Sequence, residues 1–371
     1  MANYRILLTG GGTGGHIYPL VAVAQKLSQD ADIRFFGSPG NFGEYLISAG
    51  VKIQRIAASK LRRYFSLQNV LDFFRFFWGL AQGWWKIFWF MPDVAFSKGG
   101  PGSLSVVLMC RFYRIPLIIH ESDAVPGLTS KVSARGARKI ELAFAEAKEY
   151  FAKFTKAEVN VVGQPVRNEV LVFGDGAQAK KHFGFSPDIA VILIIGGSQG
   201  AEAINDFVLN NLTVLLGKFQ ILHVVGSNNY NQHKAELDFI SQKINQDLLK
   251  RYHCEAYLSD NLAEAYNAAD LVVSRAGAGS IFEIAAKGKP AVIIPLATSA
   301  NGHQEKNAYA YAETGAAVIM EEANLLENIF INEIVRILSD GSLYSKMSEA
   351  ARSFYKEDAA NRIADDIIKL V

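Results

Sequence analysis

Short apolar runs alternate along almost the whole chain with longer stretches in which apolar residues recur at helical spacing. The apolar runs predict strands near 4–9, 32–36, 52–56, 93–97, 116–120 and 138–143 in the first half, and near 190–195, 219–225, 254–258, 270–274, 290–295 and 316–320 in the second. The clearest predicted helices cover 17–29, 200–212, 279–287 and 303–313. Strands that alternate with helices form parallel sheets covered by helices on both faces. We therefore predict an α/β protein with two doubly wound, Rossmann-like sheets.

Glycine-rich turns follow three of the predicted strands, at 10–16, 196–200 and 274–280. Glycine lets the backbone turn sharply and approach a ligand closely. The helix start that follows such a turn offers free N–H groups and the positive end of a dipole, which suit phosphate. A tight connection without a ligand is the alternative for any single turn, but it explains three such turns less well. The pattern predicts a phosphorylated ligand in a cleft between two doubly wound domains.

The length and charge of the chain narrow the class of protein. A chain of 371 residues favours two domains, and we place them at 1–167 and 168–345, with a C-terminal helix over 346–371 that packs back on the first. The net charge of +2 gives no argument for a nucleic-acid partner. Cys110 and Cys254 lie in different halves, which suits a reducing compartment and indicates neither a disulfide framework nor a zinc site. No signal-peptide pattern opens the chain, so we expect a cytoplasmic protein.

The first glycine turn also satisfies the dinucleotide-binding spacing G-x-G-x-x-G through Gly10, Gly12 and Gly15. This spacing alone is a weak signal. A nicotinamide enzyme usually carries an acidic residue at the end of the second strand, where it binds the ribose. Here that strand ends with Phe35 and Phe36 followed by glycine, so the sequence disfavours a dehydrogenase.

A strongly aromatic helix is predicted between residues 60 and 90, and it holds all four tryptophans. One broad face carries Phe73, Phe74, Phe77, Trp78, Leu80, Ala81, Trp84, Trp85, Phe88 and Trp89, and the narrow opposite stripe carries Arg75, Gly79, Gln82 and Lys86. The segment is too short and too often interrupted by charge for a transmembrane span. Because tryptophan prefers the membrane interface and cations attract anionic headgroups, we favour a helix that lies in the membrane surface. We predict membrane contact by five of these residues, Phe73, Phe77, Trp84, Trp85 and Phe88.

Two other interpretations of this helix remain open. It is either an ordinary helix with its aromatic side chains in the core, or a dimer interface.

Six segments together resemble one known family. In order along the chain they are 10–19, 120–127, 163–167, 196–200, 274–283 and 303–304. They are similar to the corresponding segments of the MurG family, the N-acetylglucosaminyl transferases of peptidoglycan synthesis. The resemblance covers nearly the whole chain, and six segments in the right order are far more specific than any one of them.

The resemblance implies the GT-B glycosyltransferase architecture, with two domains that face each other across a cleft. It implies inverting transfer of N-acetylglucosamine from UDP-N-acetylglucosamine to the 4-hydroxyl of lipid I, undecaprenyl-pyrophosphoryl-N-acetylmuramoyl-pentapeptide. The product, lipid II, links the reaction to cell-wall biogenesis, cell shape and cell division. The implied location is peripheral, at the cytoplasmic face of the cell membrane, where other cell-wall synthesis proteins are possible partners. The family needs no metal or other cofactor, which agrees with the lack of a convincing Asp-x-Asp or His/Cys cluster in the sequence.

The resemblance assigns the donor to the second domain. Glu283 accepts both ribose hydroxyls, and the backbone at Ala278, Gly279 and Ser280 faces the pyrophosphate. The remaining donor residues are Ser198 and Gln199 for the phosphates and sugar, Arg167 for the nucleotide, and Gln304, preceded by His303, for the transferred sugar. The alternatives are a solvated helix carboxylate for Glu283 and a polar residue at a helix start for Gln304.

The resemblance assigns the acceptor to the first domain. Thr13, Gly14 and Gly15 bind its pyrophosphate, and Asp123 lies beside it. His16 is the favoured general base, since an imidazole can take the proton of the attacking hydroxyl. Glu121 is either the base or the group that orients it. The alternative for His16 is substrate binding alone.

The chain departs from the family pattern at two places. Ser122-Asp123 stands where the family commonly has Gln-Asn, and 99–103 reads Gly-Gly-Pro-Gly-Ser where the family commonly has Gly-Gly-Tyr-Val-Ser-Gly. These differences leave open another lipid acceptor or another nucleotide sugar on the same fold. A UDP-sugar 2-epimerase and a non-catalytic subunit that binds a sugar nucleotide are the further alternatives.

Overall fold

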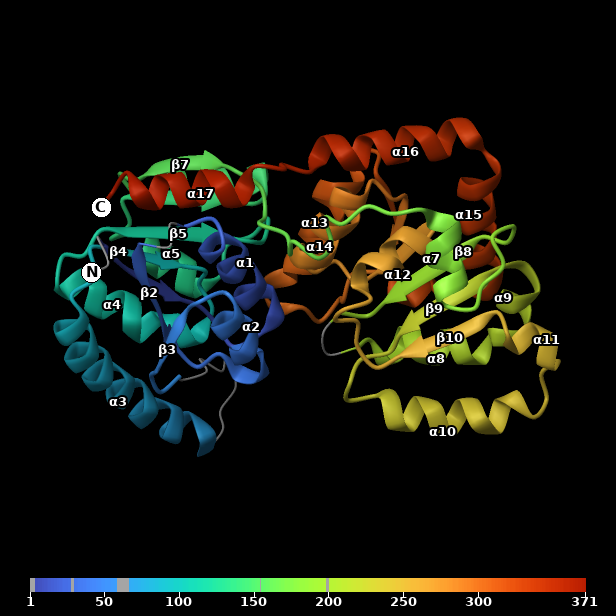
Figure 1. Ribbon diagram of the computed structural model, residues 1–371, viewed down its shortest axis with the longest axis horizontal. Coiled ribbons are helices and arrows are strands. Elements are labelled where there is room, and N and C mark those ends of the chain that lie inside the picture. Colours follow the sequence, from blue (N-terminus) through green and yellow to red (C-terminus); the bar gives the residue numbers. More distant parts are fainter. Residues whose placement is uncertain (1–3, 28–29, 59–66, 154, 198–199) are drawn as a thin grey trace. The chain divides into compact units, whose positions relative to one another are not determined.

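The computed structural model describes residues 4–27, 30–58, 67–153, 155–197 and 200–371. The chain divides into two compact units (Figure 1). The first comprises Met1–Arg167 together with Lys356–Val371, and the second comprises Asn168–Tyr355.

The first unit is built on a seven-stranded parallel sheet with the strand order β3-β2-β1-β4-β5-β6-β7. Its strands are β1 (Tyr4–Thr9), β2 (Ala31–Gly37), β3 (Lys52–Arg55), β4 (Val94–Ser97), β5 (Leu117–Glu121), β6 (Lys139–Leu142) and β7 (Glu158–Val161). Its helices are α1 (Gly14–Ala24), α2 (Gly43–Ser48), α3 (Leu67–Phe90), α4 (Leu104–Phe112), α5 (Leu128–Ala134), α6 (Lys148–Ala152) and α17 (Ala359–Ile368).

Both faces of this sheet are buried, which explains why its central strands read as continuous apolar runs. Neighbouring residues of β1 enter different cores, because side chains alternate along a strand. Leu8 packs with side chains of α1, α2 and α17, whereas Leu7 packs with side chains of α3, α4 and α6.

The second unit is built on a six-stranded parallel sheet with the strand order β10-β9-β8-β11-β12-β13. Its strands are β8 (Val191–Ile195), β9 (Gln220–Val224), β10 (Tyr252–Glu255), β11 (Leu271–Ser274), β12 (Ala291–Ile293) and β13 (Ala317–Ile319). Its helices are α7 (Gly176–His182), α8 (Glu202–Asn210), α9 (Leu212–Lys218), α10 (Tyr230–Ser241), α11 (Gln246–Leu249), α12 (Leu262–Ala268), α13 (Ala278–Lys287), α14 (His303–Ala312), α15 (Glu327–Ser339) and α16 (Gly341–Phe354).

The prediction of two doubly wound α/β domains is confirmed. In each sheet the strand order reverses once, between β1 and β4 in the first unit and between β8 and β11 in the second. Ligands of open parallel sheets bind beyond the carboxyl ends of the strands at such a reversal. The topology therefore marks one candidate site in each unit.

Several element predictions need correction. The strand β7 was missed, because Glu158–Val161 is a short edge strand with two polar residues and one neighbour, β6. The strand predicted at 254–258 covers Tyr252–Glu255, and the helix predicted at 17–29 covers Gly14–Ala24.

The single helix predicted over 346–371 is also wrong. The segment contains the end of α16, which belongs to the second unit, and all of α17, which belongs to the first. Tyr355 is extended between them, with φ −69° and ψ 134°. Ile363 and Ile367 of α17 then enter the core beside β1, which the local pattern does not reveal.

Candidate functional site

In the second unit, two glycine turns leave neighbouring strands at the same level of the sheet. The last residues of β8 and β11, Ile195 and Ser274, are register partners, and the turns at 196–200 and 274–280 follow them. Both turns lie where the strand order reverses. The structure therefore brings together the two donor-side motifs that are separated by about eighty residues in the sequence.

The turn after β8 requires glycine at both of its ends. A Cβ atom at Gly196 would lie 2.5 Å from the Ala201 nitrogen, and one at Gly200, where φ is +81°, would lie 2.4 Å from the Val225 carbonyl oxygen. Ser198 and Gln199, predicted to bind the donor phosphates and sugar, lie outside the described residues.

The turn after β11 leads directly into α13. Ala278, Gly279 and Ser280 form its first turn, and the capping residue Gly277 has no side chain that could occupy their N–H groups. The first intrahelical hydrogen bond of α13 runs from the Ile281 N–H to the Gly277 carbonyl and is 3.1 Å long. The helix start thus presents backbone donors and a positive dipole end, which can bind an anion.

Glu283 follows on the next turn of α13 and is partly buried. The Tyr266 hydroxyl of α12 donates to Glu283 Oε2 at 3.1 Å. Because Tyr266 is fully buried, the carboxylate is anchored to the domain core. Sequence analysis did not identify Tyr266, since nothing in its local pattern distinguishes it from an ordinary core tyrosine.

Gln304 shapes the loop that follows β12. Its Oε1 accepts from the Leu296 N–H at 3.0 Å, and its own N–H donates to Ser299 Oγ at 3.2 Å. Since the side-chain oxygen is used inside the loop, the amide NH₂ is the part of Gln304 that suits a sugar hydroxyl. His303 lies directly before it as the first residue of α14.

Arg275 is a buried residue of this site to which sequence analysis assigned no role. Its guanidinium donates to the carbonyl oxygens of Ile294 (3.3 Å) and Pro295 (3.4 Å) and lies 2.5 Å from Glu322 Oε2. Arg275 therefore fixes the turn after β11 against the loop after β12. The signal for it was an arginine inside an apolar, glycine-rich turn.

In the first unit, the glycine turns after β1 and β4 are joined by a hydrogen bond from the Gly11 N–H to the Gly99 carbonyl, 2.9 Å long. The imidazole of His16 lies against both turns. A Cβ atom at Gly11 would come within 3.0 Å of His16 Nδ1, and one at Gly100 within 3.0 Å of His16 Nε2. Since φ of Gly100 is +86°, that position favours glycine for a second reason. The ring is held where only glycine leaves it room.

His16 is a neutral base in this setting. Its Nδ1 lies 2.8 Å from Thr13 Oγ1, so the predicted acceptor residue Thr13 orients the ring. Burial and the nearby positive charge of Lys98 lower the pKa of His16 to about 4, although Asp123 opposes this shift. The ring is therefore unprotonated at neutral pH and able to take a proton.

Lys98, at the end of β4, is a buried charged residue that sequence analysis missed. Its Nζ donates to His120 Nδ1 at 2.7 Å, to Gln164 Oε1 at 3.2 Å and to Ser122 Oγ. His120 Nε2–H donates to the Gly163 carbonyl at 2.8 Å, which leaves Nδ1 as an acceptor. Burial lowers the pKa of Lys98 to about 7. Ser122, which differs from the residue common in the family, thus places a hydroxyl acceptor beside Lys98.

Glu121 organises the loop that carries Asp123. Its Oε1 accepts from the Asp123 N–H at 3.1 Å and its Oε2 from the Gly127 N–H at 3.3 Å. Burial, together with the charge of Asp123, raises the pKa of Glu121. Of its two predicted roles, this geometry favours orientation of the site over direct proton abstraction.

Arg167 ends the first segment of the first unit. Its guanidinium carbon lies 4.3 Å from the centre of the Tyr18 ring on α1, a cation–π contact. This contact places Arg167 beside the helix that begins at the glycine turn of β1.

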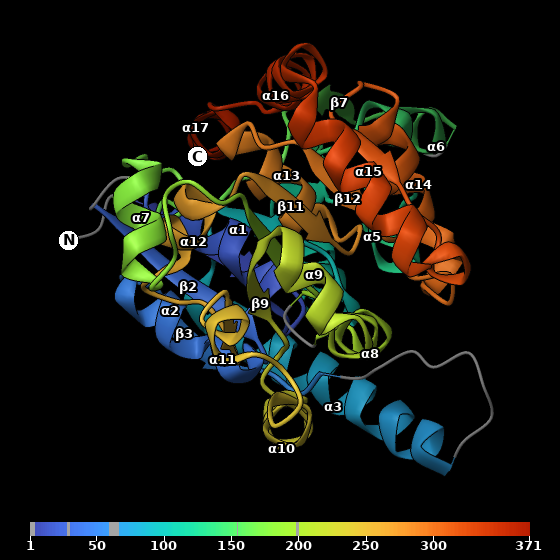
Figure 2. The same cartoon turned by 90° about the vertical axis from the view of Figure 1, so that its right-hand side faces the viewer.

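The long helix α3 packs beside α4 and runs along the outside of the first unit (Figure 1, Figure 2). Its five predicted membrane-contact residues are all exposed: Phe73 58%, Phe77 52%, Trp84 47%, Trp85 55% and Phe88 49%. Phe74, Trp78 and Trp89 are exposed beside them. The interpretation that places these aromatic side chains in the core is wrong.

Three residues of the polar stripe of α3, Gly79, Gln82 and Lys86, lie on the side that packs on the protein, whereas Arg75 is exposed. Gln82 Oε1 accepts from the Ala57 N–H at 2.8 Å, and Lys86 Nζ donates to the Arg55 carbonyl at 2.6 Å. Gly79 allows the close approach, since a Cβ atom there would lie 2.6 Å from the Ala57 carbonyl oxygen. The helix therefore buries a narrow face of mixed polarity, which includes the core residues Ile87 and Phe90, and exposes most of its aromatic side chains. Among the described residues, no helix combines the length and the apolar character that a membrane span needs.

Two doubly wound units, each with a ligand-type glycine turn at its strand reversal, are the architecture of a two-domain glycosyltransferase. The model of the glycosyltransferase family 28 N-terminal domain matches residues 6–141, and that of the family 28 C-terminal domain matches residues 191–363. The chain belongs to this family and, within it, to the MurG transferases, as its full-length relatives show.

Those relatives are named UDP-N-acetylglucosamine–N-acetylmuramyl-(pentapeptide) pyrophosphoryl-undecaprenol N-acetylglucosamine transferases. One from Natranaerobius thermophilus is 34% identical over 374 residues, covering 99% of this chain and 100% of the relative. One from Bacillus cereus is 35% identical and covers 99% of both chains.

Solved structures agree with this family. The crystal structure of MurG from Acinetobacter baumannii has a TM-score of 0.74 and 25% identity over 99% of both chains. A UDP-GlcNAc 2-epimerase from Neisseria meningitidis, bound to UDP-GlcNAc, has a TM-score of 0.70 at 14% identity and covers 98% of this chain and 100% of that one. The epimerase likeness shows a shared fold alone.

Proposed function

We propose that this protein transfers N-acetylglucosamine from UDP-N-acetylglucosamine to the 4-hydroxyl of lipid I, with inversion at the sugar carbon, and so makes lipid II for peptidoglycan. The observation that carries the proposal is that the chain aligns with named transferases over 99% of its length. The geometry of each unit supports it. The second unit offers an uncapped helix start with Glu283, and the first offers a neutral imidazole held on two glycine turns.

For the donor, we assign the uridine ribose to Glu283 and the pyrophosphate to the N–H groups of Ala278, Gly279 and Ser280. The anchored carboxylate suits two ribose hydroxyls, and the helix start suits two phosphates. Gln304 contributes its amide NH₂ to the transferred sugar, and Ser198, Gln199 and Arg167 complete the donor set as the family motif implies.

For the acceptor, we assign the pyrophosphate to the backbone at Thr13, Gly14 and Gly15. His16 removes the proton of the acceptor 4-hydroxyl while that oxygen forms a bond to the anomeric carbon. The bond from this carbon to the UDP oxygen breaks, and UDP leaves with the electron pair. The dipole of α13 stabilises the negative charge that develops on UDP. Glu121 and Asp123 orient the loop beside the acceptor.

We assign α3 to the membrane surface, which makes the protein peripheral at the cytoplasmic face. A lipid-linked acceptor requires the enzyme to work at that surface. The exposed aromatic side chains listed above, together with the partly exposed Phe76, suit the apolar side of the interface. The other open interpretation is that this face contacts another copy of the chain. A measurement of the oligomeric state distinguishes it from membrane contact.

Replacement of both Trp84 and Trp85 by serine is expected to reduce binding to anionic vesicles at least tenfold. The reason is that both indoles are about half exposed on α3, so their loss removes apolar area from the proposed contact without emptying the core. Vesicle co-sedimentation measures the effect. The matched control is Phe239→Ser, which removes an exposed aromatic ring from α10 of the second unit and should leave binding unchanged. Unaltered vesicle binding by the double variant, with a monomer–dimer equilibrium that shifts instead, would favour the dimer interface.

The function is tested with labelled UDP-N-acetylglucosamine and a short-chain lipid I analogue, with sugar transfer and UDP release followed in parallel. We expect equal amounts of labelled disaccharide product and UDP. Formation of UDP-N-acetylmannosamine, or of UDP and free N-acetylmannosamine where water completes the reaction, in the absence of acceptor would instead indicate an epimerase. Tight binding of the donor with neither product would indicate the non-catalytic subunit, and transfer to a different lipid acceptor only would retain the donor half of the proposal.

A further inference from the structure

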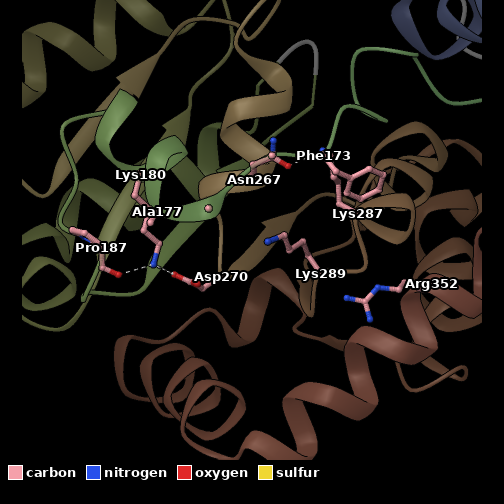
Figure 3. Close-up of a pocket in the computed structure, with 11 residues that line it drawn as sticks. Phe173, Ala177, Lys180, Pro187, Asn267, Asp270, Lys287, Lys289 and Arg352 are labelled. Atoms are coloured by element: carbon pink, nitrogen blue, oxygen red, sulfur yellow. Dashed lines mark hydrogen bonds and ion pairs between the residues drawn. The ribbon is translucent and has the colours of Figure 1, made fainter.

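A pocket of the second unit lies at the amino ends of the strands β8, β11 and β12 (Figure 3). It encloses about 490 Å³. Its wall is formed by residues before the strands β8, β11 and β12, together with α7, the C-terminal ends of α12 and α13, and α16. The donor turns follow the carboxyl ends of the same strands. The ten-residue helix α13 begins at one site and ends at the other, a length of about 15 Å.

The pocket is strongly basic. Four cations line it, Lys180, Lys287, Lys289 and Arg352, against the single carboxylate of Asp270. Lys180 Nζ lies 2.8 Å from Asp270 Oδ2, so these two charges neutralise each other. Lys287, Lys289 and Arg352 make no ion pair with a carboxylate of the lining, although the charge of Asp270 also acts on Lys289 and that of Glu264 acts on Lys287.

The three remaining cations have donors to offer. Lys287 Nζ donates to the Val172 carbonyl at 2.6 Å and to Asn267 Oδ1 at 2.9 Å, which leaves one of its three N–H groups. Lys289 Nζ donates to the Ala269 carbonyl at 2.6 Å, which leaves two. Within the described part of the chain, no hydrogen bond occupies the guanidinium of Arg352. In Figure 3, Lys289 lies between Asp270 and Arg352.

Burial and mutual repulsion disfavour the charged forms of the pocket lysines. Burial, with the neighbouring charge of Lys289, lowers the pKa of Lys287 to about 8. Burial and the cations Lys180 and Arg352 also lower the pKa of Lys289, although Asp270 opposes this shift. An anion in the pocket would relieve the repulsion among these groups.

We propose that this pocket binds a small soluble molecule with a phosphate or diphosphate group, at a site separate from the donor site. Three cations that keep N–H donors and make no ion pair in the pocket lining suit an anion of about two negative charges. The volume exceeds that of one phosphate and leaves room for an attached organic group. The exposed ring of Phe173, whose centre lies 4.6 Å from Lys287 Nζ, offers that group an apolar surface at the edge of the pocket. The proposal does not depend on the proposed transferase activity.

The test is a calorimetric titration of the full-length protein with pyrophosphate while UDP saturates the donor site. We expect one pyrophosphate per chain, with an affinity that falls steeply as salt is added. Arg352→Gln and Lys289→Gln are each expected to weaken binding about tenfold. The matched control is Lys346→Gln, which removes an exposed cation from the same helix as Arg352 and should leave binding unchanged.

Three results would overturn the proposal. The first is that pyrophosphate does not bind once UDP is saturating. The second is that both pocket variants bind pyrophosphate as tightly as the parent protein. The third is that the protein binds phosphatidic acid vesicles but does not bind free pyrophosphate. Thermal melting of each variant shows whether it is folded. Arg352→Gln keeps the test decisive if Lys289→Gln unfolds, because Arg352 makes no hydrogen bond to the described residues that its loss would break.

Discussion

Replacement of Glu283 by alanine is expected to weaken UDP binding about 100-fold. In the proposed donor site this carboxylate accepts both ribose hydroxyls, and hydrogen bonds to a charged group contribute about 1.5–3 kcal/mol each. A loss of about 3 kcal/mol corresponds to roughly two orders of magnitude in the dissociation constant. Isothermal titration of the purified chain with UDP measures the change directly.

Two further variants separate the role of Glu283 in binding from a role in folding. Tyr266→Phe removes only the hydroxyl that donates to Glu283 Oε2, so we expect a smaller loss of UDP affinity, of about tenfold or less. Glu313→Ala removes an exposed carboxylate at the end of α14 and should leave UDP binding unchanged. An unchanged affinity in a folded Glu283→Ala protein would exclude the ribose assignment.

Replacement of His16 by alanine is expected to lower kcat by about 10²- to 10⁴-fold, the usual contribution of a general base. The affinity for UDP should not change, because His16 belongs to the first unit and the proposed donor residues with described side chains, Arg167 apart, belong to the second. Steady-state kinetics with the lipid I analogue, together with UDP titration, distinguish these two quantities. If kcat changes less than threefold while KM for the acceptor rises, His16 binds substrate and another group takes the proton.

The pH profile gives an independent readout for His16. A base works only when it is unprotonated, and the pKa of His16 is lowered from its ordinary value to about 4. We therefore expect kcat/KM for the acceptor to show no loss due to this group as the pH falls from 8 to 5, and a tenfold loss per unit below pH 4. A loss of rate as the pH falls through 6.5, absent in the His16→Ala protein, would contradict the burial and charge argument. His182→Ala, which removes an exposed imidazole from the second unit, is the control for histidine loss.

The same shift affects stability in one direction. Because the pKa of His16 is lower in the folded protein than in the unfolded chain, the folded state binds fewer protons between about pH 4 and 6.5. The contribution of His16 to the free energy of unfolding is complete above the pKa that His16 has in the unfolded chain. It disappears as the pH falls through the pKa that His16 has in the folded protein.

Much of the candidate site could be predicted from the sequence alone, because its signals are local. A glycine run after an apolar strand and before a helix specifies a strand–turn–helix connection, and strand order then places it. Gly11, Gly196 and Gly200 lie in predicted turns and are constrained by neighbouring atoms, and Gly100, which was not part of a predicted turn, is constrained in the same way. Glu283 was assigned from the resemblance to the family, on the helix that follows such a turn.

The partners of these residues could not be predicted in this way. Lys98 contacts His120, Ser122 and Gln164, which come from different elements, and only the pairing of β4 with β5 brings the strand ends together. Tyr266 reaches Glu283 from another helix in the same manner. A lysine or a tyrosine after an apolar run carries no local sign of such a contact.

The amphipathic pattern of α3 was visible in the sequence, but its orientation was not. Hydrophobic periodicity shows that a helix has two unlike faces and does not say which one meets the protein. The close approach at Gly79 and the hydrogen bonds of Gln82 and Lys86 decide this, and they leave the aromatic side chains outward.

The sequence by itself therefore determined the α/β class, the two doubly wound sheets, the glycine turns and the family, since each depends on residues close together in the chain. Tertiary structure alone decided the neutral state of His16, the anchoring of Glu283, the outward face of α3 and the basic pocket beside Arg352. The physical reason is the same in each case. Burial, Coulomb interaction and hydrogen bonding depend on distances in space between elements far apart in the chain, and no local pattern encodes those distances.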